Sequence, residues 1–145
     1  MAQGISALGK LRLGAAAFIL RQAVTSTGPT TANTLCQHGL DMLAAGMAST
    51  AAHVFRAAIH ADPTSSEAQH GLIRALRDAG RIEQAIGAAV AVTDLTPNDP
   101  LAFTELSISL QQAGHLPEAE AARAHARLLE EEMQFQTSPD EETLP

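Results

Sequence analysis

Aromatic side chains are nearly absent from this chain of 145 residues, which has no tryptophan, no tyrosine and only four phenylalanines. Aromatic residues are enriched in strands, so their scarcity favours helices that pack closely on small side chains. There is also only one cysteine, Cys36. A single thiol excludes intramolecular disulfide bonds and paired-cysteine metal motifs. We expect Cys36 to be either buried or part of the lining of a groove.

Positive charge is scarce as well. Nine Lys and Arg stand against sixteen Asp and Glu, which gives a formal net charge of −7. A nucleic-acid binder needs a basic surface, so we expect no nucleic-acid partner. His53 and His60 lie seven residues apart without a suitable third ligand, so we expect no metal site. Phosphate-binding loops and nucleophile or metalloprotease motifs are lacking, and we predict neither catalysis nor a cofactor.

The stretch from Ala32 to Met133 repeats itself with a period of 34 residues. Each period carries two apolar stripes at helical spacing, separated by a turn that is centred on glycine. Neither helix of such a pair buries its stripe alone, so neighbouring pairs must stack. The residues that recur in step are Gly46, Gly80 and Gly114; Ala51, Ala85 and Ala119; and Pro63 with Pro97.

Local signals predict where these helices begin and end. Gly46 suits the left-handed residue that follows a helix. Pro63 disfavours helical geometry in the residue before it, so the second helix should end at Asp62. Ser65 or Ser66 is well placed to cap the helix that follows.

This pattern resembles the tetratricopeptide repeat family, with repeats at residues 32–65, 66–99 and 100–133. The resemblance implies an all-α solenoid of three helix–turn–helix repeats, to which we add an extra helix at the N-terminus. The sequence departs from the family pattern at several signature positions: His38, Gln69, Ile73, Arg123 and Glu131.

The resemblance also implies that the first helix of each repeat lines a concave groove, in which a helix or an extended segment of a partner protein binds. Arg74 and Arg77 would form a basic centre for one acidic contact. The alternative is that they belong to an ordinary solvated face. The predicted groove residues are Asn33, Cys36, Leu40, His70, Arg74, Arg77, Thr104, Ile108 and Gln111, and Leu101 occupies a further groove position.

Residues 1–31 differ from the rest because no Asp or Glu precedes Asp41. They predict a basic amphipathic helix followed by a linker. Its apolar run, residues 13–20, is too short to cross a bilayer, which needs about 20 residues. We favour a retained helix over a cleaved targeting peptide; it would cap the first repeat, contact a membrane surface or dock on a partner. The predicted anchor residues are Ile5, Leu8, Leu11, Arg12, Phe18 and Ile19.

At the other end, the sequence predicts a helix over residues 117–135, and we expect an acidic, disordered tail over residues 134–145. We expect no further helix within this sequence to cover the last repeat. We therefore expect one side of this helix to be open and to associate with another molecule. The residues on that side are Ala119, Ala122, Ala126 and Leu129.

Two functions fit these expectations. The first is a non-catalytic scaffold or adaptor that binds another protein, with a hetero-complex favoured over a homodimer. The alternative is an accessory structural subunit of a larger, possibly membrane-bound complex, anchored by residues 1–24. We expect a cytoplasmic location, with or without peripheral membrane contact.

Overall fold

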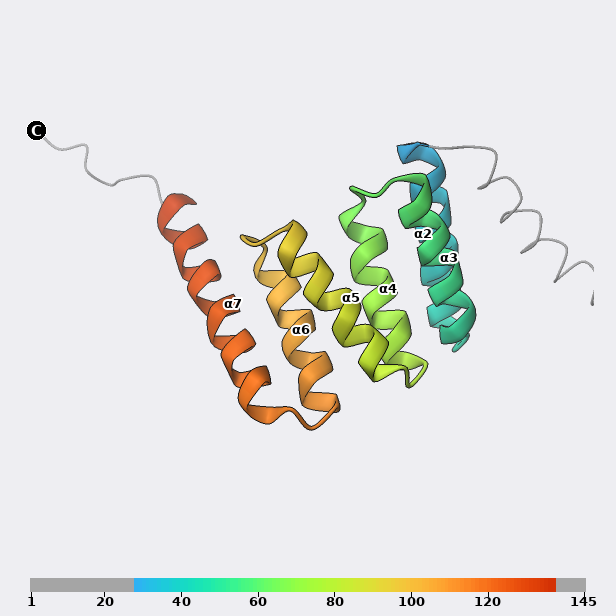
Figure 1. The fold of residues 1–145 in the computed structure, drawn as a ribbon. Coiled ribbons are helices and arrows are strands. Elements are labelled where there is room, and N and C mark those ends of the chain that lie inside the picture. Colours follow the sequence, from blue (N-terminus) through green and yellow to red (C-terminus); the bar gives the residue numbers. More distant parts are fainter. Residues whose placement is uncertain (1–27, 138–145) are drawn as a thin grey trace, which may run out of the picture. The chain divides into compact units, whose positions relative to one another are not determined.

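The computed structural model describes residues 28–137. Within this range all the regular secondary structure is α-helical, as predicted (Figure 1). The helices follow one another in pairs joined by short turns, which confirms the all-α helical-repeat class. Their bounds are α2 (Pro29–Ala44), α3 (Ala48–Ala61), α4 (Ser66–Asp78), α5 (Ile82–Leu95), α6 (Pro100–Gln112) and α7 (Leu116–Thr137).

The turns inside the three repeats have the same geometry. Gly46, Gly80 and Gly114 have φ values of 76°, 76° and 86°, in the left-handed region that glycine adopts without steric cost. In the first turn the Met47 amide donates to the Met42 carbonyl at 2.8 Å, which is the closing bond of a Schellman motif. The equivalent bonds join Arg81 N to Leu76 O at 2.8 Å and His115 N to Leu110 O at 2.9 Å.

The links between repeats are fixed by side-chain caps. Asp62 accepts hydrogen bonds from the amide and the hydroxyl of Thr64, at 3.0 and 2.7 Å. Ser65, rather than Ser66, caps α4, because its hydroxyl accepts from the Ala68 amide at 3.3 Å. In the next link Asp99 caps α6 by accepting from the Leu101 amide at 3.0 Å.

Both ends of the described range are more helical than we expected. α2 begins at Pro29, so residues 29–31 are helical rather than part of a linker. Proline is well suited to the first helical position, where its missing amide hydrogen has no partner to lose. α7 continues to Thr137, past the expected start of the tail at residue 134. The Thr137 hydroxyl donates to the Met133 carbonyl at 2.9 Å and satisfies one acceptor of the last turn.

The chain divides into two compact units, residues 1–75 and 76–145, with the boundary inside α4. Unit 1 has a core built around one aromatic ring. Phe55 of α3 is completely buried, and its ring lies against the backbone of Gly39 in α2 and of Gly71 in α4. A methyl group on Gly39 would lie only 2.6 Å from Phe55 Cζ. The absence of a side chain at both glycines therefore makes room for the ring.

Unit 2 has a core of mostly small residues, in which one serine hydroxyl joins two neighbouring helices. α6 contacts both α5 and α7. The buried Ser107 hydroxyl of α6 donates to the Ala119 carbonyl of α7 at 2.8 Å. Ser109, also fully buried, donates to the Glu105 carbonyl within α6 at 2.9 Å.

The expectation of an open side on α7 was wrong for the residues that we named. Ala119, Ala122, Ala126 and Leu129 are buried, each no more than 8 % exposed. They lie at helical spacing on the side of α7 that packs within its own repeat, so α6 covers them. An exposed apolar side does exist on α7, but different residues form it.

Candidate functional site

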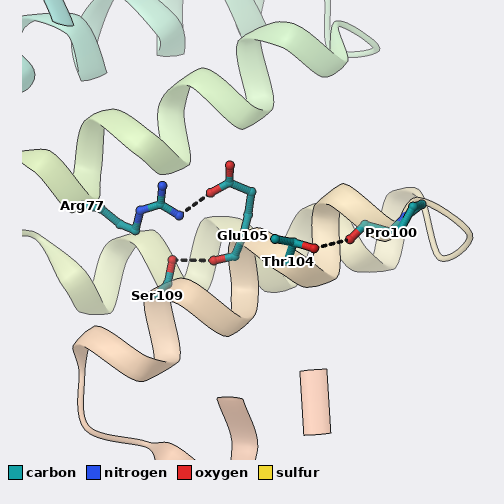
Figure 2. Close-up of polar contacts among 5 residues, drawn as sticks. All are labelled: Arg77, Pro100, Thr104, Glu105 and Ser109. Carbon is teal, nitrogen blue, oxygen red and sulfur yellow. Dashed lines mark hydrogen bonds and ion pairs between the residues drawn. The ribbon is translucent and has the colours of Figure 1, made fainter. Parts of the chain in front are cut away.

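Arg77, near the end of α4, forms an ion pair with Glu105 of α6 (Figure 2). Both side chains are largely buried, with 11 % and 15 % of their surface exposed. We expected Arg74 and Arg77 to form a basic centre. The alternative was an ordinary solvated face. At Arg77 the structure shows neither, because its side chain is largely buried and its charge is paired with Glu105. Arg74 has an exposed side chain.

Hydroxyl groups on α6 are also satisfied within the molecule. Thr104 donates to the Pro100 carbonyl at 3.0 Å, and Ser109 donates to the carbonyl of Glu105, the partner of Arg77 (Figure 2). Because its hydroxyl proton is used within the helix, Thr104 offers a ligand its methyl group and an acceptor oxygen. The polar groups of this region are therefore paired with one another before any partner arrives.

An apolar strip lies on one side of α6, formed by Leu101, Thr104 and Ile108 at steps of three and four residues. We call these three residues the α6 strip. Leu101 is 48 % exposed, and Thr104 and Ile108 are half-buried. Glu105 lies next to the strip on the same helix, so the strip is bordered by the Arg77–Glu105 pair. This arrangement offers apolar contact area beside a fixed, neutral polar pair.

Gln111, another predicted groove residue, is tied to α7. Its side-chain oxygen accepts a hydrogen bond from Arg123 Nη2 at 3.0 Å, and Arg123 also pairs with Glu120 at 3.4 Å. On α7 as well, the ring of His125 packs on that of Phe103 with 4.2 Å between the ring centroids. The Gln111 side chain is therefore used in the contact between α6 and α7.

The remaining predicted groove residues belong to unit 1. Asn33 is exposed and Leu40 half-buried on α2, and His70 is half-buried on α4. Cys36 is fully buried, so the buried alternative is the correct one and its thiol lines no open surface. Burial raises the pKa of the Cys36 thiol, the hydroxyl of Ser65 opposes this by hydrogen bonding, and nearby Glu67 and Asp62 add to the rise.

The predicted anchor residues, from Ile5 to Ile19, lie outside the described residues. The alternative function as an anchored subunit depends on them and stays a prediction. In residues 28–137 no helix has the length and apolar character that a membrane span requires. The same range holds no cluster of three potential metal-ligating side chains.

Sequence reasoning missed Glu105 as a part of this site. It stands six residues into its repeat, at a position that the family pattern leaves open. The signal that could have found it was a combination of two charges. Arg77 is a cation near the end of the first helix of repeat two, and Glu105 is an anion near the middle of the first helix of repeat three. Neither residue alone indicates the pair.

A family model described as tetratricopeptide repeat matches residues 42–106. The tetratricopeptide repeat is confirmed over that range. It includes the turn at Gly46, the turn at Gly80 and most of the α6 strip. Among curated proteins, no sequence matches the chain.

Several solved tetratricopeptide-type structures are similar to this chain in fold. PcrH, in complex with the chaperone binding region of PopB, has a TM-score of 0.66 and 24% identity, and the match covers 70% of this chain and 82% of PcrH. The Yersinia enterocolitica type III secretion translocator chaperone SycD has a TM-score of 0.66 and 22% identity over 78% of this chain and 82% of its own. MamA has a TM-score of 0.64 and 22% identity over 86% and 72%.

Proposed function

We propose that the protein is a non-catalytic adaptor that binds a helix or an extended segment of a partner protein along the α6 strip. The observation that carries the proposal is the exposure of Leu101 beside Thr104 and Ile108, on the helix side that the family resemblance assigns to ligand binding. Apolar residues at steps of three and four form the surface on which an amphipathic helix or a strand-like peptide packs.

The Arg77–Glu105 pair shapes what the α6 strip would bind. An acidic group of the partner would have to compete with Glu105 for Arg77. Separating a largely buried pair leaves a charge without its partner, which costs free energy. The strip therefore favours a segment whose contact with this region is apolar.

Two of the similar structures support an adaptor role. PcrH was crystallised with the chaperone binding region of PopB, and SycD is a translocator chaperone. Each of these relates the helical-repeat fold to the handling of another protein. The proposal is non-catalytic because the sequence carries none of the phosphate-loop, nucleophile-elbow or metalloprotease motifs that support chemistry.

Site-specific photo-crosslinking in the native cell tests this proposal. A benzoylphenylalanine replaces Leu101 on the α6 strip, and in the matched control it replaces Leu116, which is 58 % exposed at the start of α7. We expect the probe at Leu101 to capture one protein through one contiguous segment, identified by mass spectrometry. Capture of the same protein from both positions, or from Leu116 alone, would overturn the assignment of the strip.

A further inference from the structure

α7 has a second apolar side, opposite to the one that packs on α6. Ala121, Ala124, Leu128 and Phe135 share this side, since they follow one another at steps of three, four and seven residues. We call these four residues the outer stripe. Leu128 is 57 % exposed and Phe135 is 82 % exposed. Single exposed apolar residues are ordinary, but these are aligned along one helix.

Carboxylates interrupt the outer stripe. Glu131 and Glu132 stand three and four residues after Leu128 and four and three residues before Phe135, so they lie on the same side of α7. Residues 127–137 contain three glutamates, at 130, 131 and 132, and one cation, Arg127. The last part of α7 therefore combines exposed apolar groups with a net negative charge.

The negative charge beside the outer stripe indicates which kind of molecule could bind there. Two copies of α7 that paired through their outer stripes would bring glutamates of like charge together, and such juxtapositions cost several kcal/mol at an interface. A basic, apolar segment has the complementary character. Its apolar side chains would cover Leu128 and Phe135, while its cations would meet Glu131 and Glu132.

The chain itself contains a segment of that kind. Residues 1–27 include three cations, Lys10, Arg12 and Arg21, and no carboxylate. The apolar residues among the predicted anchor residues recur at helical spacing. α7 has 22 residues and is therefore about 33 Å long. In a helical conformation a segment of 27 residues has the length to follow it.

We propose that residues 1–27 of one molecule dock on the outer stripe of α7 of a second copy. The contact joins two different surfaces, so it is heterologous and leaves one donor segment and one acceptor stripe free in each dimer. Further copies then add head to tail until a ring closes or a filament grows. The α6 strip takes no part, so this proposal and the adaptor function stand or fall separately.

Two variants of the full chain test the pairing. The donor variant carries Lys10→Glu, Arg12→Glu and Arg21→Glu, and the acceptor variant carries Leu128→Asp and Phe135→Ser. Light scattering should show that the unmodified chain gains mass as its concentration rises, while each variant alone stays monomeric. In an equimolar mixture, the acceptor variant supplies the functional segment 1–27 and the donor variant supplies the functional outer stripe. The mixture should therefore give a complex of two molecules and nothing larger.

The control variant carries Leu95→Asp and Val90→Ser on α5, where the two residues are 66 % and 43 % exposed. It should associate like the unmodified chain. Circular dichroism checks that all variants keep the same helix content. A monomeric unmodified chain at every concentration, or a mixture of the two variants that stays monomeric, would overturn the proposal.

Because the chain has no tryptophan, Phe18→Trp provides an independent probe of the donor segment. Its emission should shift to shorter wavelength as the chain associates. The shift should disappear when the same chain also carries Leu128→Asp and Phe135→Ser. An emission that does not respond to the acceptor substitutions would show that residues 1–27 do not reach the stripe.

Discussion

Unit 1 and unit 2 use the same turns but build their cores in opposite ways. In unit 1 the Phe55 ring occupies space beside two glycines. In unit 2 the residue one period later is Ala89, and the core is closed by small side chains and by the Ser107 hydrogen bond to the Ala119 carbonyl. The first core depends on shape and apolar burial, and the second depends more on directional polar contacts.

The 34-residue period specifies the turns but does not specify the contacts in the core. The glycine turns recur because each needs a left-handed residue, whatever surrounds it. The contact at the eighth position of the repeat does not recur, since Gly39 receives a ring whereas Ser107 donates a hydrogen bond. Substitutions at these positions should therefore have effects of different size and kind in the two units.

The largest effect should come from Phe55→Ala. Removing a fully buried ring should lower the free energy of unfolding by about 3–5 kcal/mol, because the two flanking glycines offer no side chains to fill the cavity. Urea titration followed by circular dichroism measures the loss. The matched control is Phe135→Ala, which removes a ring that is 82 % exposed and should change stability by about 0.5 kcal/mol or less. Equal losses in both variants would contradict a core built on Phe55.

Gly39→Ala should come next. The new methyl group would lie 2.6 Å from Phe55 Cζ, and such overpacking typically costs about 1–3 kcal/mol. Gly87→Ala in α5 is the control, since a methyl group there meets nothing within 4 Å. That variant should gain roughly 0.4–1 kcal/mol from its better helix propensity and a less flexible unfolded chain. Urea titration followed by circular dichroism measures the stability of both variants. A loss of stability in both would contradict the close contact between the Phe55 ring and Gly39.

Glu105→Ala should cost roughly 1–2 kcal/mol, because it leaves the largely buried Arg77 without its ion-pair partner. We place it below the glycine variant because the pair keeps some contact with solvent. Combining Glu105→Ala with Arg77→Met should cost less than the two single losses added together. Strict additivity in this double-mutant cycle would show that the pair is not coupled.

Ser107→Ala should have a smaller effect, about 0.5–1.5 kcal/mol, from the loss of one neutral hydrogen bond between α6 and α7. The Ala119 carbonyl is inside a helix and keeps its position in the backbone ladder. A thermal melt of the variant beside the unmodified chain measures the change. An unchanged melt would show that this hydroxyl does not stabilise unit 2.

The smallest effect concerns pH. Burial raises the pKa of the Cys36 thiol above its ordinary value of 9.0, so the folded chain holds this proton more tightly than the unfolded chain. The resulting stability is present below pH 9.0 and is lost as the pH rises through the raised, folded-state pKa. The difference in stability between the unmodified chain and Cys36→Ala should therefore narrow or reverse above pH 9.0. A difference that stays constant would contradict a buried thiol.

Much of the fold could be predicted from the sequence, because its signals are local. The glycine turns and the Ser65 cap each depend on a few neighbouring residues. The Arg77–Glu105 pair could not be predicted, since it depends on the relative rotation of two helices separated by a third. The two sides of α7 were confused for a related reason. The stripe from Ala119 to Leu129 looked open, but it is the surface with which α7 packs in its own repeat.

The two glycines that receive Phe55 also limit how this chain could be rebuilt by duplication or exchange of its repeats. A copied first repeat would carry its phenylalanine to a new neighbour. The sixth residue of the second repeat is Gly71, but the sixth residue of the third is Glu105. A first repeat inserted before α6 would thus direct a ring toward the Glu105 carboxylate, and it would also separate Glu105 from Arg77. Repeats of equal length are for this reason not interchangeable, and the structure constrains the order in which they follow one another along the chain.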